Sequence, residues 1–316
     1  MTGGTAKATV RVPATSANLG PGFDTLGLAL GLHDEIEAET SDSPGVEIAV
    51  EGEGAGELDL GEGHLVVTTM RATFGRMGLP QPRGIRLRCL NRIPQARGLG
   101  SSSAAICAGI LAARALAATP YAQPGPAGPA ELTDDAVLAL ATEIEGHPDN
   151  VAPCLAGGLT VAWTDAGGVP HLVRLLPHEA VRPVVLVPAH RLSTEIARGL
   201  LPKDVPHADA AANAGRAALL VAALTARPEP DLLLAATEDR LHQDYRAPAM
   251  PHTADLVRRL RKAGIAAVVS GAGPTVLAFS TVNTQDLIAP EVGNDWHIQP
   301  LDVETRGARV VSLETR

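Results

Sequence analysis

The stretch that most constrains the fold is "RIPQARGLGSSSAAICAGILAARALAA", residues 92–118. It continues an alternating segment that predicts a half-buried strand, passes through a glycine–serine turn and enters a long alanine-rich run that predicts a helix. Gly98 and Gly100 let the backbone of the turn approach a ligand without a Cβ clash. The stretch therefore predicts a strand, a tight turn and a helix in direct succession.

The same turn is a candidate anion site. Ser101 or Ser102 can cap a helix that begins around Ser103, and the free N–H groups at such a helix end favour phosphate. A serine hydroxyl there could also ligate Mg²⁺. The turn is not a Walker A motif, because no G-K-[ST] follows, nor a Rossmann fingerprint, because Ser103 replaces the third glycine. It is not a hydrolase elbow either, because G-x-S-x-G is absent from it. A turn that only caps a helix is an equally weighted alternative.

The chain has 316 residues, more than one compact domain usually holds, and this length predicts two domains. Hydrophobic residues make up 45% of it and aromatic residues only 2%, so alanine, valine, leucine and isoleucine must build the core. The formal net charge is −9. Because nucleic-acid binding needs a basic surface, the composition favours a small-molecule or protein partner and argues against nucleic acid.

Cys89, Cys107 and Cys154 lie far apart in the sequence and contain no C-x-x-C pair. This spacing argues against a disulfide framework or a zinc site and favours buried, reduced thiols. The N-terminus carries no apolar segment of a signal peptide, and the longest apolar run, residues 104–113, is far shorter than the roughly 18 residues that span a bilayer. We expect a soluble cytoplasmic protein without membrane contact.

Alternation and helical periodicity predict a mixed order of strands and helices. Strands are expected within residues 1–50 and at 84–94, 157–163, 183–188 and, as two short strands joined by a glycine turn, 265–280. Helices are expected at 64–78, 103–118, 134–146, 207–226, 231–242 and 253–264. The segment 119–133 is rich in proline, glycine and alanine and predicts a surface loop. The mixed order indicates an α+β protein whose second unit begins near residue 170.

Three further glycine-rich segments differ in what they could bind. Asn18 and Asp24 lie in a loop between two predicted strands, where polar side chains are well placed for a ligand, although both are also common turn formers. In "SGAGPTVLAF", Gly271 and Gly273 permit a tight turn, and taken alone this segment favours a hairpin connection without a binding role. The segment 51–64 is acidic, would repel phosphate and is expected to be a solvated loop.

The segment "EIEGHPDN" carries acidic and imidazole side chains at every second position. Glu143, Glu145, His147 and Asp149 could form a metal cluster, but Pro148 disturbs the geometry. A helix end with one useful carboxylate is the favoured interpretation. His147 is expected to be a structural hydrogen-bonding group.

In their order along the chain these motifs resemble those of the GHMP small-molecule kinases. The loop with Asn18 and Asp24, the "GLGSSSAA" turn and "SGAGPT" near the C-terminus carry this resemblance. Within that superfamily the chain is similar to the homoserine kinase family through "VRVPATSANLGPGFDTLGLAL", "RIPQARGLGSSSAA", "EGHPDNVAPCLAGGLT", "LSTEIARGLLP", "DRLHQDYRAP" and "SGAGPTVLAF". These segments span residues 10–279, nearly the whole chain.

The resemblance implies a two-domain α+β fold, with a ribosomal-protein-S5-like domain at residues 5–169 and a ferredoxin-like domain at residues 170–316. It implies ATP in a cleft between them, with its phosphates on the glycine–serine turn, where backbone amides and the helix dipole need no lysine. The implied reaction is ATP- and Mg²⁺-dependent phosphorylation of the side-chain hydroxyl of L-homoserine to O-phospho-L-homoserine, a step of threonine biosynthesis.

By the same resemblance, Ser102 and Glu145 hold the Mg²⁺ ion, with Glu143 as the alternative carboxylate. His64 stands near the adenine, where the family commonly has asparagine. The residues implied to contact ATP are Pro94, Arg97, Gly98, Leu99, Gly100, Ser101, Ser102, Ser103 and Ala104.

The resemblance also implies the homoserine site. Arg198 and Arg246 match the arginines that bind the substrate carboxylate, for which a planar guanidinium is well suited. Asp24 matches the acceptor for the substrate ammonium group. The other implied substrate contacts are Asn18, Asn150, Thr194, Gly271 and Gly273.

Asn150 and Arg198 are the implied catalytic residues. Relatives that act on mevalonate or galactose have an aspartate in the place of Asn150, and that aspartate can act as a base. An asparagine cannot take a proton at neutral pH. We therefore expect catalysis by positioning and charge stabilisation, which the loose transition state of phosphoryl transfer tolerates.

Three alternatives stay open: a GHMP kinase acting on mevalonate or a sugar, a GHMP-fold sensor that binds ligands without turnover, and a plain α+β scaffold. The paired arginines and Asn150 argue against the first, and the intact glycine–serine turn with its carboxylate argues against the second. If homoserine is the substrate, we expect the close analogue threonine to compete at the site of the two arginines as a feedback inhibitor. A homodimer fits the habit of the family.

Overall fold

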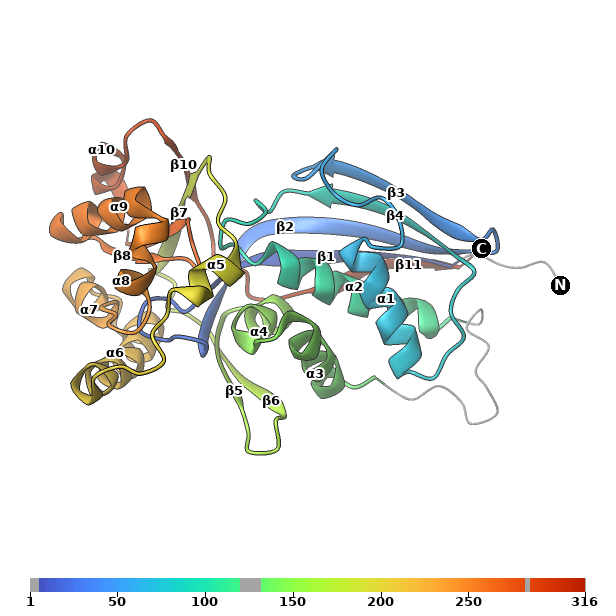
Figure 1. Ribbon diagram of the computed structural model, residues 1–316, viewed down its shortest axis with the longest axis horizontal. Coiled ribbons are helices and arrows are strands. Elements are labelled where there is room, and N and C mark those ends of the chain that lie inside the picture. The colour runs from blue at the N-terminus through green and yellow to red at the C-terminus, as the bar shows by residue number, and fades with distance from the viewer. Residues whose placement is uncertain (1–5, 120–131, 282–284, 316) are drawn as a thin grey trace.

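The computed structural model describes residues 6–119, 132–281 and 285–315, which form two β-sheets with helices packed against them (Figure 1). The larger sheet has the order β11-β1-β2-β4-β3, and β5, which pairs with β2 and β6, extends it. All its pairs are antiparallel except that of β3 with β4. Its strands are β1 (Ala6–Ala17), β2 (Leu26–Ser41), β3 (Gly45–Gly52), β4 (Gly84–Asn91), β5 (Leu159–Thr164), β6 (Pro170–Leu175) and β11 (Arg309–Thr315).

The alternating sequence in the C-terminal half of β2 places buried side chains on one face of the larger sheet. Ile36 and Ala38 are buried, whereas the intervening Glu37 pairs with Lys7 of β1 at 2.6 Å on the opposite face. Successive side chains of a strand point to opposite faces, so the apolar set lies on one side. The helices packed on that side are α1 (Leu65–Arg76), α2 (Ser101–Ala117), α3 (Asp134–Glu145) and α4 (Pro148–Ala156).

Small residues let α2 pack closely against α1. A Cβ atom added at Gly109 of α2 would lie 2.9 Å from the carbonyl oxygen of Val66 and 2.9 Å from Cβ of Thr69, both in α1. These distances are shorter than van der Waals contact, so the approach of the two helices needs glycine at this position.

The smaller sheet has the order β10-β7-β9-β8, and Leu256 and Leu260 of α9 pack into its own apolar cluster. Its strands are β7 (Arg182–Pro188), β8 (Ala266–Val269), β9 (Val276–Ser280) and β10 (Trp296–Pro300). The helices of this part are α5 (Thr194–Gly199), α6 (His207–Thr225), α7 (Pro230–Ala236), α8 (Gln243–Arg246), α9 (Pro251–Lys262) and α10 (Ala289–Val292), with 3-10 turns η1 (Ala247–Ala249) and η2 (Gln285–Leu287).

The C-terminal segment returns from the smaller sheet to the larger one, where β11 pairs with β1 (Figure 1). On the way, the Asp302 carbonyl accepts a hydrogen bond from Gly31 N–H, and the Glu304 carboxylate lies 2.6 Å from Nε2 of His33. The predicted division into residues 5–169 and 170–316 stays a prediction. Two strands of the predicted second domain, β6 and β11, pair within the larger sheet, which is otherwise built from the predicted first domain.

Most predicted elements are confirmed, including α1, α2 and the two short strands β8 and β9. The helix expected at 231–242 is wrong at its end, because Asp239 accepts hydrogen bonds from the backbone N–H groups of His242 and Gln243 and starts the separate helix α8. Helix α4 was not predicted; it begins at Pro148, a position at which a helix tolerates proline. The loop expected at 119–133 lies mostly outside the described residues.

The mixture of helices and sheets confirms the α+β class. The three cysteines are buried and unpaired, as their spacing predicted. Across the described ranges, no helix is both long and apolar enough to cross a membrane.

Candidate active site

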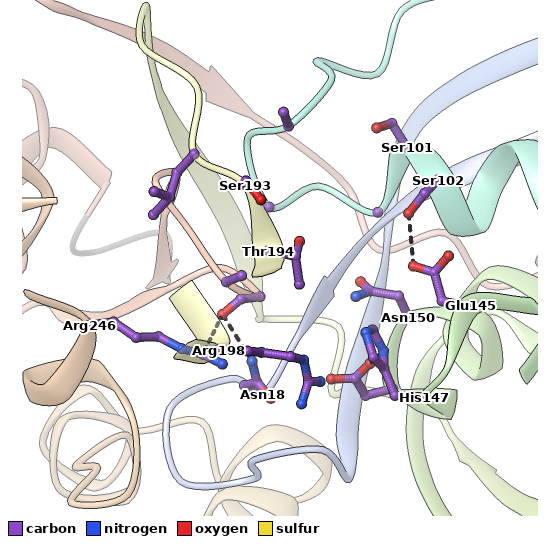
Figure 2. Close-up of a pocket in the computed structure, with 17 residues that line it drawn as sticks. Asn18, Ser101, Ser102, Glu145, His147, Asn150, Ser193, Thr194, Arg198 and Arg246 are labelled. Carbon is purple, nitrogen blue, oxygen red and sulfur yellow. Dashed lines mark hydrogen bonds and ion pairs between the residues drawn. The ribbon is translucent and has the colours of Figure 1, made fainter. Parts of the chain in front are cut away.

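Two neighbouring cavities meet at the glycine–serine turn, because Ala96, Ser101 and Ser102 line both. The first cavity, of about 260 Å³, is shown in Figure 2 and has mixed polar and charged walls. The second, of about 410 Å³, has mainly apolar walls. The first is lined by Asn18, Ala96, Gly98, Gly100, Ser101, Ser102, Glu145, His147, Asp149, Asn150, Leu192, Ser193, Thr194, Arg198, Arg246, Gly271 and Ala272.

The two glycines of the turn have a conformation and a packing that other residues would disturb. Gly98 and Gly100 have φ angles of 77° and 70°, in the left-handed region. A Cβ atom at Gly98 would collide with the Ser270 carbonyl oxygen, and one at Gly100 with Oγ1 of Thr15. Gly100 itself, and not a serine, occupies the N-cap position of α2, so the predicted serine cap is wrong. The serine hydroxyls are left for other partners.

The hydroxyls of Ser102 and Ser103 both donate to Oε1 of Glu145, each at 2.8 Å (Figure 2 shows the Ser102 bond). Glu143, the alternative carboxylate, instead pairs with Arg76 at 2.5 Å, and its side chain is 64% exposed. Among the described residues no three His, Cys, Asp or Glu side chains gather to hold a metal ion. A hydroxyl and one carboxylate nevertheless suit Mg²⁺, which prefers oxygen ligands and usually takes the rest from phosphates and water.

The side chain of Asn150 is fixed by Thr15, whose hydroxyl donates to Oδ1 of Asn150 at 2.8 Å. Oδ1 is therefore the acceptor, and no described residue accepts a hydrogen bond from the amide NH₂ group of Asn150, which lines the first cavity. Asn150 can thus donate to a ligand oxygen but cannot serve as a base.

Two residues to which the sequence assigned no contact with a substrate or ATP also line this cavity. His147 and the buried Asp149 are joined by a hydrogen bond of 2.7 Å between Nδ1 and Oδ1. Burial lowers the pKa of His147, but the hydrogen bond and charge of Asp149 outweigh burial, and the pKa rises above its ordinary value. The available signal was Pro148, which starts α4 and places Asp149 and Asn150 in its first turn.

Arg246 is 1% exposed and lines the first cavity. Its guanidinium donates to the carbonyl oxygens of Ala197 and Gly271, each at 3.3 Å, and to Nδ1 of His242 at 3.1 Å. No described carboxylate lies within ion-pair distance of it. Burial lowers the pKa of Arg246, and the nearby charge of Arg198 lowers it further.

Arg198 does have a carboxylate partner, since its two terminal nitrogens donate to Asp24 at 2.7 and 3.3 Å. Burial lowers the pKa of Arg198, but the contact with Asp24 outweighs it and raises the pKa. Asp24 is not among the residues that line the cavity, but it is hydrogen-bonded to Arg198, which does line it. The predicted carboxylate-binding and ammonium-binding residues are therefore close together.

The other predicted substrate residues differ in their surroundings. Asn18 donates to the Gly271 carbonyl at 2.9 Å and accepts from Asp24 N–H at 3.0 Å, so its side chain ties two loops together at the cavity wall. Thr194 and Gly271 line the cavity, whereas Gly273 does not. Their contacts with a substrate stay predictions.

Several predicted ATP contacts lie behind the turn and line neither cavity. Leu99, Ser103 and Ala104 are buried, and the Arg97 guanidinium donates to the carbonyl oxygens of Pro188 and Ala189 at 3.0 and 2.9 Å. The residues of this group absent from both linings are Pro94, Arg97, Leu99, Ser103 and Ala104. In the structure they support the turn, and their contact with ATP stays a prediction.

The second cavity extends from the turn to the start of α1. His64 caps α1 by accepting a hydrogen bond from Val66 N–H at 3.3 Å, and burial lowers the pKa of its ring. The acidic segment 51–64 is mostly exposed, as predicted for a solvated loop, and part of it also lines this cavity through Leu58 and Asp59. The other lining residues are Asp34, Ile36, Gly63, Leu65, Val66, Cys89, Asn91, Gln95 and Ala105.

Two family models match the chain: GHMP kinases N terminal domain over residues 64–158 and GHMP kinases C terminal over residues 220–297. A homoserine kinase of Streptomyces coelicolor is 56% identical over 306 residues, which cover 97% of this chain and 95% of that protein. A homoserine kinase of Streptomyces avermitilis is 57% identical over 304 residues, or 96% of this chain and 95% of that protein.

Among solved structures, homoserine kinase from Cytophaga hutchinsonii has a TM-score of 0.80 at 27% identity and covers 96% of this chain and 97% of its own. These similarities run through both sheets and confirm the predicted two-domain α+β fold of the GHMP kinases. They also confirm the narrower resemblance that the order of the motifs indicated. The chain belongs to the homoserine kinase family of the GHMP kinases.

Proposed function

We propose that this chain transfers the γ-phosphoryl group of ATP to the side-chain hydroxyl of L-homoserine, giving O-phospho-L-homoserine and ADP. The observation that carries the proposal is the buried guanidinium of Arg246, which lines the first cavity without a carboxylate partner among the described residues. A buried charge without a counter-ion is costly. An anionic group of the substrate would supply that counter-ion.

The charges around the cavity fit a zwitterionic amino acid. A carboxylate between Arg246 and Arg198 would receive two guanidinium groups, a geometry that favours planar, charge-assisted hydrogen bonds. Asp24, held 2.7 Å from Arg198, would accept a hydrogen bond from the substrate ammonium group, which is attached to the same Cα atom as the carboxylate. The substrate hydroxyl would then extend toward Asn150 and the turn, on the side of the cavity opposite Arg246 (Figure 2).

ATP would occupy both cavities, with its base in the second and its phosphates over Ser101 and Ser102, which line both. The backbone N–H groups at the start of α2 and the helix dipole favour phosphate at that point. Ser102 and Glu145 would hold Mg²⁺, which when bound offsets the charge that develops on the transferred phosphoryl oxygens.

Asn150 would position the hydroxyl by donating its amide hydrogen to the hydroxyl oxygen, while Thr15 keeps the amide oriented. Arg198 and the helix end would stabilise charge in the transition state. Early removal of the hydroxyl proton is not required, because phosphoryl transfer proceeds through a loose transition state.

The proposal extends to the setting of the reaction. Threonine has the same ammonium and carboxylate groups with a hydroxyl nearby, so it would compete for Arg198 and Arg246 and act as a feedback inhibitor in threonine biosynthesis. We further propose a homodimeric protein of the cytoplasm.

The test measures ADP release from Mg-ATP by the purified protein with L-homoserine, mevalonate, galactose, L-threonine or no acceptor. Release that depends on L-homoserine alone and is reduced by added threonine is the expected result. Release with mevalonate or galactose would keep the kinase activity and overturn the substrate assignment. ATP binding without release for any acceptor would overturn the proposed reaction in favour of a ligand sensor.

A further inference from the structure

His242 lies fully buried directly behind the first cavity, four residues before Arg246. Its Nε2 is 2.8 Å from the carbonyl oxygen of Gly20, and its Nδ1 is 3.1 Å from a terminal nitrogen of Arg246. A carbonyl can only accept a hydrogen bond and a guanidinium can only donate one. The two partners therefore select the neutral ring with its hydrogen on Nε2 and a lone pair on Nδ1.

The partners of Arg246 orient its guanidinium without neutralising it. The lone pair of His242 and the carbonyl oxygens of Ala197 and Gly271 are uncharged acceptors. The ring of Phe23 lies 5.4 Å from Cζ of Arg246 and 5.2 Å from the His242 ring, so it packs against both. The positive charge remains available for a ligand in the cavity.

We propose that His242 is a positioning residue for Arg246, whose neutral imidazole orients the guanidinium toward the carboxylate of the amino-acid substrate. The proposal rests on the proposed function, because it needs a substrate with a carboxylate in the first cavity. The Nδ1 lone pair of His242, rather than the hydrogen bond from Nε2–H to Gly20, determines how strongly the site prefers a substrate that has a carboxylate.

Burial and the charge of Arg246 favour the neutral imidazole, the carboxylates of Asp239 and Asp24 oppose it, and the pKa of His242 is lowered on balance. Asp239 lies 3.7 Å from Nε2, and Asp24 pairs with Arg198. A protonated ring would point a second N–H at the guanidinium and remove the acceptor.

Two substitutions separate the two ring nitrogens. The side-chain oxygen of His242→Asn can take the place of Nδ1 and accept from Arg246, whereas the bond to Gly20 is lost. The longer side chain of His242→Gln can reach the place of Nε2 and keep the bond to Gly20, whereas the acceptor for Arg246 is lost. A role confined to tying the Gly20 loop to α8 would make Asn the more harmful change.

The measurement is the ratio of kcat/KM for L-homoserine to that for 3-aminopropan-1-ol, which has the same hydroxyl and ammonium group but no carboxylate. Where the second compound reacts too slowly, its inhibition constant against homoserine replaces kcat/KM. We expect His242→Asn to keep the wild-type ratio within about threefold. We expect His242→Gln to lower it at least tenfold through a higher KM for homoserine, with kcat and the KM for ATP changed less than about threefold.

The proposal also predicts that His242→Gln has no further effect on the ratio in an Arg246→Gln background, because the effect passes through that arginine. Equal ratios in the two single variants, or a larger loss in His242→Asn, would overturn it. If His242→Gln does not fold, folded His242→Asn still tests the proposal. Loss of its preference for L-homoserine over 3-aminopropan-1-ol would overturn the proposal. Absence of homoserine turnover in the wild-type protein would instead overturn the proposed function itself.

Discussion

Glu145 and Glu143 show how one carboxylate is available to a ligand while its neighbour is not. Residues two positions apart on a helix do not face the same side. Glu143 therefore points outward to Arg76, whereas Glu145 accepts from Ser102 and Ser103 at the start of α2. The carboxylate that contacts the turn is the one placed to share a metal ion with it.

We predict that Glu145→Gln lowers kcat about 100-fold or more and raises the Mg²⁺ concentration needed for half-maximal activity, because a neutral amide is a poorer metal ligand. Titrating activity with Mg²⁺ measures both effects. Glu143→Gln is the matched control and should change activity less than about twofold. Equal effects of the two substitutions would contradict the assignment of Glu145.

Asp34 is a buried carboxylate in the wall of the second cavity, and burial raises its pKa from 3.8 to about 6. Hydrogen bonds from the N–H groups of Arg92 and Ile93 to Oδ1 act in the opposite direction but do not outweigh burial. The folded protein thus holds this proton more tightly than the unfolded chain. Stability is therefore lost as pH rises from about 4 to about 6, and the loss persists above.

We predict that Asp34→Asn raises the free energy of unfolding near pH 7 by up to about 3 kcal/mol, since one pKa unit corresponds to about 1.4 kcal/mol and the amide oxygen still accepts both hydrogen bonds. The gain should largely disappear near pH 4. Denaturant unfolding at both pH values measures it, with the exposed Asp42→Asn as control. A gain independent of pH would refute the account of Asp34.

At this scale, residue types were easier to predict than their partners. The arginines, Asp24 and Asn150 are predicted at the site from the resemblance to the homoserine kinase family. The buried, unpaired state of Arg246 depends on residues more than 40 positions away, such as Ala197, and no local pattern contains it. The sequence predicts a structural role for His147, because a single histidine gives no sign of the cavity that it lines.

At the scale of elements, the contact between α1 and α2 holds the glycine–serine turn in place, because α2 begins at that turn. Gly109 lies inside α2, where glycine weakens a helix by roughly 1 kcal/mol relative to alanine. Its Cβ position is blocked by Val66 and Thr69 of α1. Close packing of the helices therefore outweighs helix propensity at this residue.

We predict that Gly109→Ala lowers the free energy of unfolding by about 1–3 kcal/mol, the usual cost of overpacking. The matched control is Gly215→Ala in α6, where nothing lies within 4 Å of the added Cβ and a gain of about 0.5–1 kcal/mol is expected. Urea unfolding of both variants compares them. If both substitutions stabilise the protein, the close helix contact is wrong.

Elements with a strong period or clear punctuation were predictable from sequence alone. Alternation of apolar and polar residues predicted β2 and β4, and Gly78 predicted where α1 ends. The end of α7 was not, because side-chain capping by Asp239 competes with a helical pattern that continues beyond it. Helix α4, with Pro148 at its start and Pro153 inside it, has a sequence that looks like a loop.

For the whole molecule, the return of the C-terminal segment joins the two sheets. Glu304 is 10% exposed in its side chain, pairs with His33 of β2 and accepts from Arg306 N–H at 2.7 Å. Pairing between residues 271 positions apart is not encoded in any local pattern, so neither the pairing of β11 nor this hydrogen bond could be predicted from the sequence. The prediction of two consecutive domains likewise did not include a C-terminal strand that pairs within the larger sheet.

We predict that the two sheets unfold together. The chain has two tryptophans, Trp163 in β5 and Trp296 in β10, so Trp163→Phe and Trp296→Phe each leave one sheet with a fluorescent reporter. The two variants should show coincident denaturant midpoints. Midpoints that differ clearly would mean that the C-terminal segment does not couple the sheets.

In the same assay, Glu304→Ala should lower the free energy of unfolding by about 1–3 kcal/mol, because it leaves the Nε2–H of a largely buried, neutral His33 without its acceptor. The exposed Glu179→Ala, which removes no ion pair of the described residues, should change it by less than about 0.5 kcal/mol. Equal changes in the two variants would argue against the role of Glu304.

The central claim is that the cavity beside the glycine–serine turn presents the hydroxyl of L-homoserine to ATP. The most direct measurement is ³¹P NMR of a reaction containing the protein, Mg-ATP and L-homoserine. The account predicts ADP together with one phosphomonoester whose signal is coupled to the protons of the terminal CH₂ group of homoserine. Inorganic phosphate as the only new signal besides ADP, or unchanged ATP, would contradict it.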